Sequence, residues 1–279
     1  MCRLAWAGDT RVKPRTQSSL AVSADDRRWV IVNASPDIRQ QIATTPALQP
    51  NGQGPSRQSP VAAVVLTNGD IDHVGGLLSL RESQPFALFA AQATHKALDG
   101  NAMFSVLDRA LVKREMVALD AAFAPVSGVE AELFAVPGKV PLWLEDDQLR
   151  VGELTESTVG ISLSANGRRI VYVPGCASLT DAVMDRLAGA DVLLFDGTLW
   201  SDDEMIVLGL GQKTGRRMGH MPIAGAGGTL EVLNALPAER RVFIHMNNTN
   251  AVLIEGSPQR REAEQAGWEI GYDGMEFNL

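Results

Sequence analysis

The sequence predicts an α/β sandwich, in which β-sheets lie inside and helices lie outside. Short apolar runs with β-branched or aromatic residues alternate along the chain with segments of helical periodicity. An Asn-Gly dipeptide joins two of these runs, as in a hairpin. The length of 279 residues is enough for a large buried core, and we expect a single domain over residues 1–279.

Short apolar runs mark the expected strands. They are Trp29–Val32, Ala62–Leu66, Phe86–Phe89, Leu133–Val136, Val192–Phe195 and Val242–His245. Two further runs, Ile161–Leu163 and Arg169–Val173, flank Asn166-Gly167. Both central residues of a type I′ turn need positive φ, which Asn and Gly adopt readily. This part of the chain therefore predicts a β-hairpin.

Helical patterns separate these strands. They occur at Leu77–Glu82, Ala93–Leu98, Leu179–Leu187, Gly228–Leu236 and Pro258–Ala266. The last begins with Ser257-Pro258, which predicts an N-cap followed by proline at the first helical position. His95 lies in a polar helical stretch and is expected to be solvated. Segments 49–60 and 137–147 are rich in loop-forming residues or interrupt the pattern, and are expected to be surface loops.

The composition excludes several functional classes. A net charge of −8 and a pI near 5.1 argue against a dedicated nucleic-acid binder, which usually has a basic face. Only two cysteines, Cys2 and Cys176, exclude a disulfide scaffold and favour reduced thiols, so we expect a cytoplasmic protein. No apolar run is long enough to span a bilayer, and residues 1–13 lack the apolar stretch of a secretory signal. An enzyme acting on a small molecule or a peptide is compatible with all of this.

Two carboxylates and an imidazole follow the apolar run that ends at Leu66. They are Asp70, Asp72 and His73, and Gly75-Gly76 comes directly after them. Like charges so close together repel one another unless a positive charge lies between them, and a divalent metal would supply it. A solvated acidic loop is the alternative interpretation of the segment.

His245 ends another apolar run, where sites in α/β folds commonly form. A lone histidine is more often structural than a ligand. Together, however, Asp72, His73 and His245 supply the two imidazoles and one carboxylate typical of non-haem iron(II) enzymes that use oxygen. The same three residues would also hold zinc with an open position. Ligand type alone does not decide between Fe(II) and zinc.

His220 and Asp196 are candidate catalytic residues. An aspartate bonded to a histidine sets its tautomer and raises its basicity, as general acid–base catalysis requires. The alternative is that Asp196 caps a helix and His220 lies in a surface loop. Cys176 has no evident neighbouring base and is expected to be a buried small residue.

Polar segments beside two strands are candidates for substrate binding. Arg15 begins the segment 15–19, and Asn33 and Arg39 bound the segment 33–39. Such side chains could bind the carboxylates of a substrate. Both segments could equally be turns, since Ser35-Pro36-Asp37 has turn chemistry.

The segment Thr67–Leu78 resembles the metallo-β-lactamase superfamily signature His-x-His-x-Asp-His with its first two histidines replaced. Asn68 and Asp70 stand at those two positions, while Asp72 and His73 match the signature. Further segments follow in the order of one branch, the pyrroloquinoline quinone (PQQ) biosynthesis protein B family. They are Arg15–Ser19, Asn33–Arg39, Leu194–Thr198, Gly219-His220 and Ile244–Asn250.

The resemblance runs over essentially the whole chain and implies the four-layer αββα metallo-β-lactamase sandwich. It implies a non-haem iron oxygenase that acts on a tyrosine-derived intermediate from a precursor peptide with a glutamate–tyrosine crosslink. Other PQQ biosynthesis proteins are implied as partners. Two alternatives stay open: a carrier that moves PQQ or its precursor towards the periplasm, and a metal-dependent hydrolase with a second metal at Asp70.

The chain departs from the family pattern at its start and at one later position. It begins where a family Cys-x-Cys-x-x-Cys zinc cluster ends, and Cys2 resembles the last cysteine of that cluster. We therefore expect the family's first strand and its structural zinc site to be missing here. Cys176 stands where hydrolytic relatives place an aspartate that bridges two metals, so the resemblance implies an impaired two-metal site.

Overall fold

The computed structural model describes residues 2–50, 58–140 and 151–279, and contains two β-sheets. The first sheet has the order β1-β2-β3-β4-β5, in which β1 is antiparallel to β2 and the other neighbours are parallel. Its strands are β1 (Leu20–Val22), β2 (Trp29–Val32), β3 (Val61–Val65), β4 (Phe86–Ala90) and β5 (Val112–Met116).

The second sheet has the order β12-β11-β10-β9-β8-β7-β6. Strands β6 to β9 pair antiparallel, whereas β9 to β12 pair parallel. Its strands are β6 (Ala122–Val126), β7 (Val129–Gly138), β8 (Glu153–Ala165), β9 (Arg168–Val173), β10 (Ala190–Asp196), β11 (Ala238–Ile244) and β12 (Glu269–Ile270).

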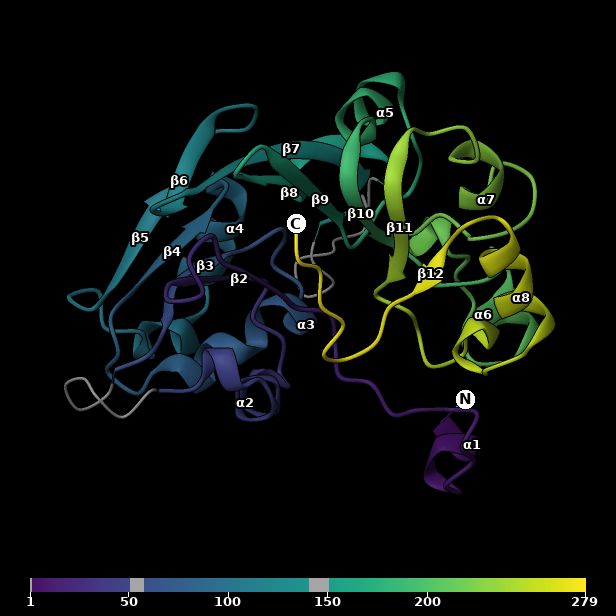
Figure 1. The fold of residues 1–279 in the computed structure, drawn as a ribbon, viewed down its shortest axis with the longest axis horizontal. Helices are drawn as coiled ribbons and strands as arrows, with labels where there is room; N and C mark the ends of the chain where they lie inside the picture. Colours follow the sequence, from purple (N-terminus) through teal and green to yellow (C-terminus); the bar gives the residue numbers. More distant parts are fainter. Residues whose placement is uncertain (1, 51–57, 141–150) are drawn as a thin grey trace.

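Helices cover the outer faces of both sheets. The α-helices are α1 (Cys2–Trp6), α2 (Ile38–Thr44), α3 (Ile71–Val74), α4 (Gln92–Asp99), α5 (Asp181–Leu187), α6 (Glu204–Val207), α7 (Thr229–Val232) and α8 (Pro258–Gln265). Short 3₁₀ helices are η1 (Pro46–Leu48), η2 (Gly75–Leu80), η3 (Ala102–Val106), η5 (Arg216–Met218) and η6 (Ala251–Leu253). Figure 1 shows the first sheet with α2 and α4 on one side of the molecule and the second sheet with α5, α7 and α8 on the other.

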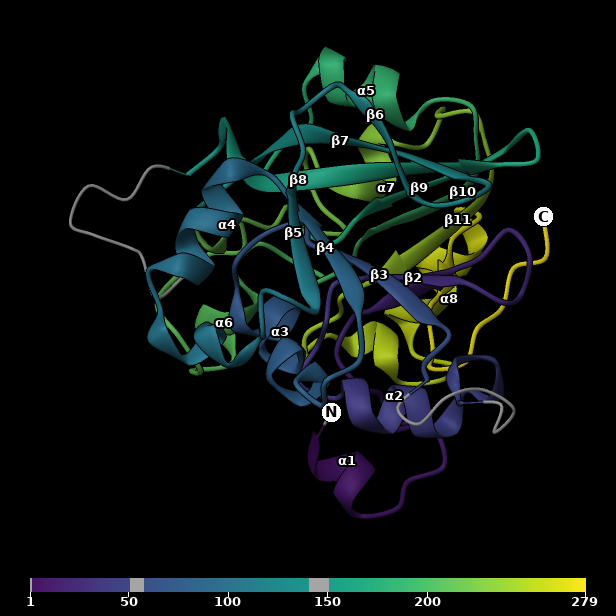
Figure 2. The same ribbon diagram turned by 90° about the vertical axis from the view of Figure 1, so that its left-hand side faces the viewer.

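The two sheets and the helices outside them form four layers, with an apolar cluster between each layer and the next. Each sheet packs on both faces because successive side chains of a strand point to opposite faces. Val30 and Val32 of β2 pack between the two sheets, against β8 to β11. Ile31, between them in sequence, packs outward against α2, α3 and α4. A third cluster lies between the second sheet and α5, α7 and α8. Figure 2 shows the resulting order, with α5 above, the two sheets between and α2 below. The predicted αββα sandwich is confirmed.

The predicted strands and the hairpin agree with the structure. Each of the six apolar runs lies in or overlaps a strand, and β8 and β9 form the antiparallel hairpin. Asn166 and Gly167 at its turn have φ of 52° and 77°, as the type I′ interpretation requires. The N-cap prediction is also confirmed, since the Ser257 side chain accepts a hydrogen bond from Arg260 N.

Three other predictions were wrong in part. The helix expected at Leu77–Glu82 is the 3₁₀ helix η2, and the one expected at Gly228–Leu236 is reduced to the single turn α7. In both places the chain is held by tertiary packing, which overrides helix propensity. His95 is only 8% exposed rather than solvated, because α4 packs that side against the body of the protein. Its Nε2 lies 3.0 Å from the carbonyl oxygen of Glu115, and burial lowers the pKa of His95.

The expected surface loops at 49–60 and 137–147 fall partly outside the described residues, and residues 137–138 belong to β7. Within the described residues, no helix is both long and apolar enough to cross a membrane.

Gly76 is expected to be essential for stability because two backbone segments meet at this residue. A Cβ atom there would lie 2.0 Å from the carbonyl oxygen of Ser35, which is far inside contact distance. Gly76→Ala should therefore lower the free energy of unfolding by about 1–3 kcal/mol or more. Chemical denaturation measures it, with Gly100→Ala as the matched control. At Gly100 the added Cβ would lie 3.4 Å from its nearest neighbour, Lys96 O. Gly100→Ala is therefore expected to unfold at the same denaturant concentration as the wild type.

Candidate metal centre

The candidate ligands follow the carboxyl ends of two strands, one from each sheet. Asp72 and His73 lie on α3, shortly after β3. His245 directly follows β11 and has φ of 57°, a left-handed conformation that is uncommon for a residue with a side chain. Residues held in such conformations concentrate at functional sites, where the surrounding structure maintains them.

The segment that follows β2 is hydrogen-bonded to the helix that carries Asp72 and His73. Ala34 N donates a hydrogen bond to the carbonyl oxygen of His73 at 2.7 Å, and Gly76 N donates to the carbonyl oxygen of Ala34 at 2.9 Å. Both bonds hold the C-terminal end of the turn that carries the two candidate ligands. The close approach at Gly76 therefore fixes where α3 lies relative to β2.

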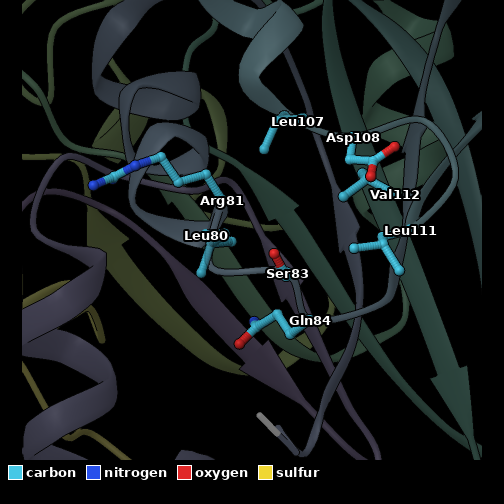
Figure 3. A pocket seen from close by; sticks show the side chains of 8 residues that line it. All are labelled: Leu80, Arg81, Ser83, Gln84, Leu107, Asp108, Leu111 and Val112. Atoms are coloured by element: carbon cyan, nitrogen blue, oxygen red, sulfur yellow. The ribbon is translucent and has the colours of Figure 1, made fainter.

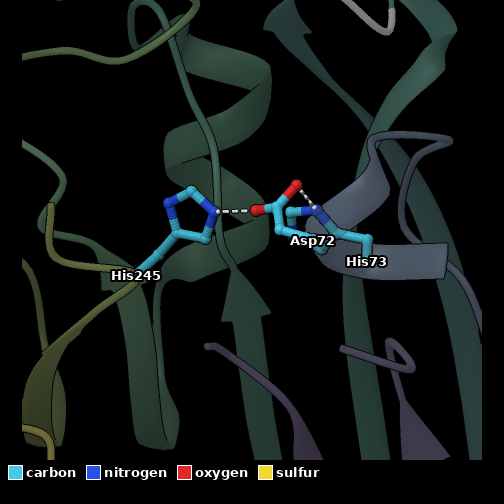
Figure 4. A group of neighbouring side chains, drawn as sticks. All are labelled: Asp72, His73 and His245. Atoms are coloured by element: carbon cyan, nitrogen blue, oxygen red, sulfur yellow. Dashed lines mark hydrogen bonds and ion pairs between the residues drawn. The ribbon is translucent and has the colours of Figure 1, made fainter. Parts of the chain in front are cut away.

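Asp72 lies between two imidazoles, as Figure 4 shows. Its Oδ2 is 2.9 Å from His245 Nε2, and its Oδ1 is 3.2 Å from His73 Nδ1. One ligand atom from each of the three residues lies within 4.8 Å of those of the other two. Burial by itself would raise the pKa of Asp72, but its two imidazole neighbours outweigh this effect and hold the pKa well below its usual range. The carboxylate is therefore charged and able to bind a cation.

His73 gives the clearest sign that this group fits a metal. Its side chain is 3% exposed, and neither of its ring nitrogens makes a hydrogen bond with the described residues. The 3.2 Å approach to Asp72 is close enough for an ion pair but does not have hydrogen-bond geometry. A buried polar atom without a partner costs about 1–3 kcal/mol. A divalent cation bound beside Asp72 would use one of these nitrogens, so the residues present fit a metal.

Asp70 lies on the loop beside this group of three. It is half-buried at the N-terminus of α3, where its carbonyl oxygen accepts hydrogen bonds from the backbone of His73 and Val74. Among the described residues, neither group of metal-ligand geometry includes Asp70. Its backbone N donates to Asn68 Oδ1 at 2.9 Å, so Asn68 shapes the loop rather than the ligand set.

The structure brings Asp196 and His220 together. Asp196 ends β10 with no exposed surface, and its Oδ2 lies 2.8 Å from His220 Nδ1. Burial by itself would lower the pKa of His220, but the charge and hydrogen bond of Asp196 outweigh it and the pKa is raised. Burial likewise acts to raise the pKa of Asp196, and His220 chiefly reverses this and lowers it. The pair is therefore stabilised as an ion pair.

The group of Asp72, His73 and His245 and the pair of Asp196 and His220 form one continuous site. The rings of His73, His245 and His220 stack in a row, with centroid separations of 5.3 and 5.2 Å. Ligand atoms of Asp196, His220 and His245 also lie within 4.8 Å of one another. His245 is thus shared between the group around Asp72 and the group around Asp196.

Thr198 is a residue of this site that the sequence did not single out. It is 8% exposed, and its Oγ1 lies 2.6 Å from Asp196 Oδ1 and 2.9 Å from His245 Nδ1. A threonine after a strand is typical of a turn, so no local signal distinguishes it. Only the pairing of β10 with β11 places its hydroxyl between these two groups.

Asn33 differs from the expected substrate-binding residue. It has no exposed surface, and its amide is bonded within the protein. Its Oδ1 accepts from Thr67 N at 2.9 Å, and its Nδ2 lies 2.9 Å from Thr67 Oγ1. Its φ of 63° turns the chain at the end of β2. These contacts position the loop after β3 and leave the buried Asn33 amide with no exposed group for a substrate.

The two candidate arginines lie in different surroundings. Arg39 is exposed near the N-terminus of α2, and its guanidinium makes no hydrogen bond or ion pair with other described residues. Arg15 is half-buried and donates from Nε to Gly271 O and from Nη1 to Lys13 O. Burial lowers the pKa of Arg15, and the nearby charge of Arg260 adds to this. Arg39 is thus the more available of the two for a substrate carboxylate.

Asn33→Ala is expected to reduce stability by about 1–3 kcal/mol, because Thr67 N would lose its buried acceptor. Arg39→Ala, at an exposed position of the same segment, should change the free energy of unfolding by no more than about 0.5 kcal/mol. If Arg39 binds substrate, its replacement should instead raise KM. Urea unfolding and steady-state kinetics on both variants test this division. Unchanged stability in Asn33→Ala would contradict the positioning role.

A small cavity lies away from the candidate ligands and is too small for an organic substrate. Its volume is about 10 Å³, which is room for about one water molecule. Figure 3 shows its lining, which comes from the end of η2 and from the segment before β5.

Comparison with known proteins now identifies the family. The chain matches the family model described as beta-lactamase superfamily domain over residues 28–246. It is 56% identical over 279 residues to the coenzyme PQQ synthesis protein B of Methylobacterium nodulans, covering 100% of this chain and 93% of that protein. The chain belongs to the coenzyme PQQ synthesis protein B family. The protein of the same name from Rhizobium meliloti is 54% identical over 278 residues, covering 100% and 90% of the two chains.

Solved structures agree with this assignment to the PQQ synthesis protein B family. The crystal structure of Zn²⁺-bound PqqB from Methylobacterium extorquens matches with a TM-score of 0.97 at 52% identity, covering 100% of this chain and 92% of that one. A diphosphatase from the PhnP family matches with a TM-score of 0.66 at 18% identity, covering 98% and 89%. The latter likeness shows the fold alone. The resemblance stated from the sequence is confirmed.

Proposed function

We propose that this protein is a metal-dependent oxygenase that hydroxylates a tyrosine-derived, peptide-derived precursor during PQQ biosynthesis. One observation carries the proposal. Asp72, His73 and His245 form a compact group of two imidazoles and one carboxylate, and neither ring nitrogen of the buried His73 makes a hydrogen bond with the described residues. This ligand set is typical of non-haem iron(II) enzymes that use oxygen.

Fe(II) is the proposed metal, and zinc fits the same three residues. When bound, Fe(II) supplies the redox chemistry that dioxygen needs for reaction with an aromatic ring. Overall, one oxygen atom enters the ring and the other leaves as water, using two protons and two electrons from an external reductant. The zinc-bound PqqB of Methylobacterium extorquens supports a metal in this family without deciding which metal works in the reaction.

His220 is the proposed residue for proton transfer. Asp196 accepts a hydrogen bond from its Nδ1, which leaves Nε2 to take up or release a proton. The His220 side chain is 18% exposed, so protons can exchange with solvent. Arg39, and secondarily Arg15, are proposed to bind carboxylates of the precursor, because arginine matches a carboxylate with two parallel hydrogen bonds.

Oxygen consumption with an authentic precursor tests the proposal. The metal-free protein is loaded with Fe(II) or zinc and supplied with precursor, ascorbate and labelled dioxygen. We expect the Fe(II)-loaded protein, but not the zinc-loaded protein, to consume oxygen and to leave one labelled oxygen atom in the product. Hydrolysis that needs no oxygen would support the hydrolase alternative. Tight binding of the precursor without turnover under either metal would support the carrier alternative, and both results contradict the oxygenase.

A further inference from the structure

The hydroxyl of Thr198 has four polar neighbours but only one proton to donate. Asp196 Oδ1 lies at 2.6 Å, His245 Nδ1 at 2.9 Å, the carbonyl oxygen of His245 at 3.0 Å and His220 Nδ1 at 3.1 Å. A hydroxyl donates once and accepts at its two lone pairs. Which neighbour receives that proton decides the roles of the others.

The proton of Thr198 is directed to Asp196. Its Oδ1 is the nearest of the four neighbours, and an ionised carboxylate only accepts hydrogen bonds. The competing carbonyl oxygen of His245 is neutral and lies farther away, and bonds to a charged acceptor are roughly twice as strong. The backbone N of Thr198 also donates to Asp196 Oδ1 at 3.0 Å, which fixes the threonine relative to the carboxylate.

The tautomer of His245 follows from this assignment. Since the Thr198 oxygen has used its proton, it can only accept from His245 Nδ1, which must then carry hydrogen. His220 Nδ1 is already directed to Asp196 Oδ2 at 2.8 Å and does not compete. With hydrogen on Nδ1, the nitrogen left to bind a metal is Nε2, which donates a hydrogen bond to Asp72 Oδ2 at 2.9 Å and would release that proton on binding a metal there.

We propose that Thr198 is a positioning residue that holds His245 with hydrogen on Nδ1 and so presents Nε2 to the metal beside Asp72. Two hydrogen bonds link these residues: His245 Nδ1 donates to the Thr198 hydroxyl, which in turn donates to Asp196. A ligating histidine usually donates its other N–H to a carboxylate, carbonyl or water, which sets the ring's orientation and basicity. Here a threonine hydroxyl, itself polarised by a buried carboxylate, takes that place. This inference rests on the metal site proposed above.

Thr198→Val and Thr198→Ser separate the hydroxyl from the shape of the side chain. Valine keeps the shape of threonine without the hydroxyl, whereas serine keeps the hydroxyl. Thr229→Val is the matched control, because Thr229 is fully buried and, among the described residues, its hydroxyl bonds only to Pro222 O, at 3.3 Å. The first measurement is the zinc Kd of each metal-free protein in competition with a chelator. We expect roughly 10–100-fold weaker binding for Thr198→Val. Thr198→Ser and Thr229→Val should bind as the wild type does.

The second measurement is the imidazole N–H resonance of His245 in the zinc-loaded proteins, assigned in ¹⁵N-histidine-labelled protein from its contacts with neighbouring protons. A proton held by the hydroxyl should appear far downfield in wild type and Thr198→Ser. It should move upfield in Thr198→Val. A structural role of Thr198 alone would lower the melting temperature without moving this resonance.

The possible outcomes distinguish this inference from the proposed metal site. If wild type binds zinc no better than Asp72→Asn, the metal site fails and the inference fails with it. If wild type binds tightly and Thr198→Val binds equally well, or keeps the His245 resonance, only the inference is overturned. A loss shared by the serine and valine variants would assign the effect to packing of the methyl group and would also overturn it.

Discussion

Asp72→Asn is expected to reduce bound metal from about one ion per chain to almost none. The substitution removes the charged oxygen between His73 and His245 and leaves two imidazoles to hold a cation alone. Turnover should fall in parallel. Metal at about 100 times its Kd should stabilise the wild type by about 2.7 kcal/mol and leave the variant unchanged. Metal analysis after dialysis and thermal melts with and without metal measure both effects.

Asp70→Asn is the matched control for this experiment. Asp70 is a neighbouring carboxylate on the same loop but lies outside both groups of metal-ligand geometry. We expect it to keep the metal and its stabilising effect. Equal loss of metal in the two variants, or full retention in Asp72→Asn, would contradict the proposed ligand set. A second ion lost only in Asp70→Asn would instead favour the two-metal hydrolase.

His220→Ala is expected to slow turnover by roughly 10²–10⁴-fold while leaving the metal bound, if His220 acts as the general acid–base. The reason is its hydrogen bond to buried Asp196, which sets its tautomer and raises its pKa. Single-turnover rates and metal content on the same samples measure the effect. Arg217→Ala, at an exposed neighbouring position, should behave as wild type.

The opposite pattern for His220→Ala has a clear structural meaning. His220, Asp196 and His245 also form a group of metal-ligand geometry. If the variant loses metal but keeps its rate per bound ion, His220 is a ligand and not the proton-transfer residue. Asp196→Asn should slow turnover about as much as His220→Ala does, since the histidine would lose its charged partner.

Local sequence patterns predicted the elements whose conformation is set by neighbouring residues. The β8–β9 hairpin follows from Asn166-Gly167, because these two residues adopt the positive φ that the turn needs. The N-cap at Ser257 is likewise contained in a few neighbouring residues. Asp72 and His73 could be recognised as candidate ligands because they are adjacent and follow a buried strand.

Burial was harder to predict, because it depends on what packs against a residue. Nothing in its neighbours distinguishes His95 from a solvated histidine, yet α4 presents it to the interior. Asn33 has the composition of a turn or a binding loop. Its role depends on Thr67, 34 residues away, which supplies the partners for its amide.

The sequence by itself determined the fold class and indicated the candidate ligands and the candidate pair Asp196 and His220, because these depend on residue type and on patterns within one element. Only the tertiary structure decided how they combine. Asp72 and His245 are 173 residues apart and meet because the carboxyl ends of β3 and β11, in separate sheets, converge. The same convergence, together with the pairing of β10 and β11, places the Thr198 hydroxyl between Asp196 and His245. Contacts of this kind arise from the packing of whole layers, and no segment of the chain contains the information alone.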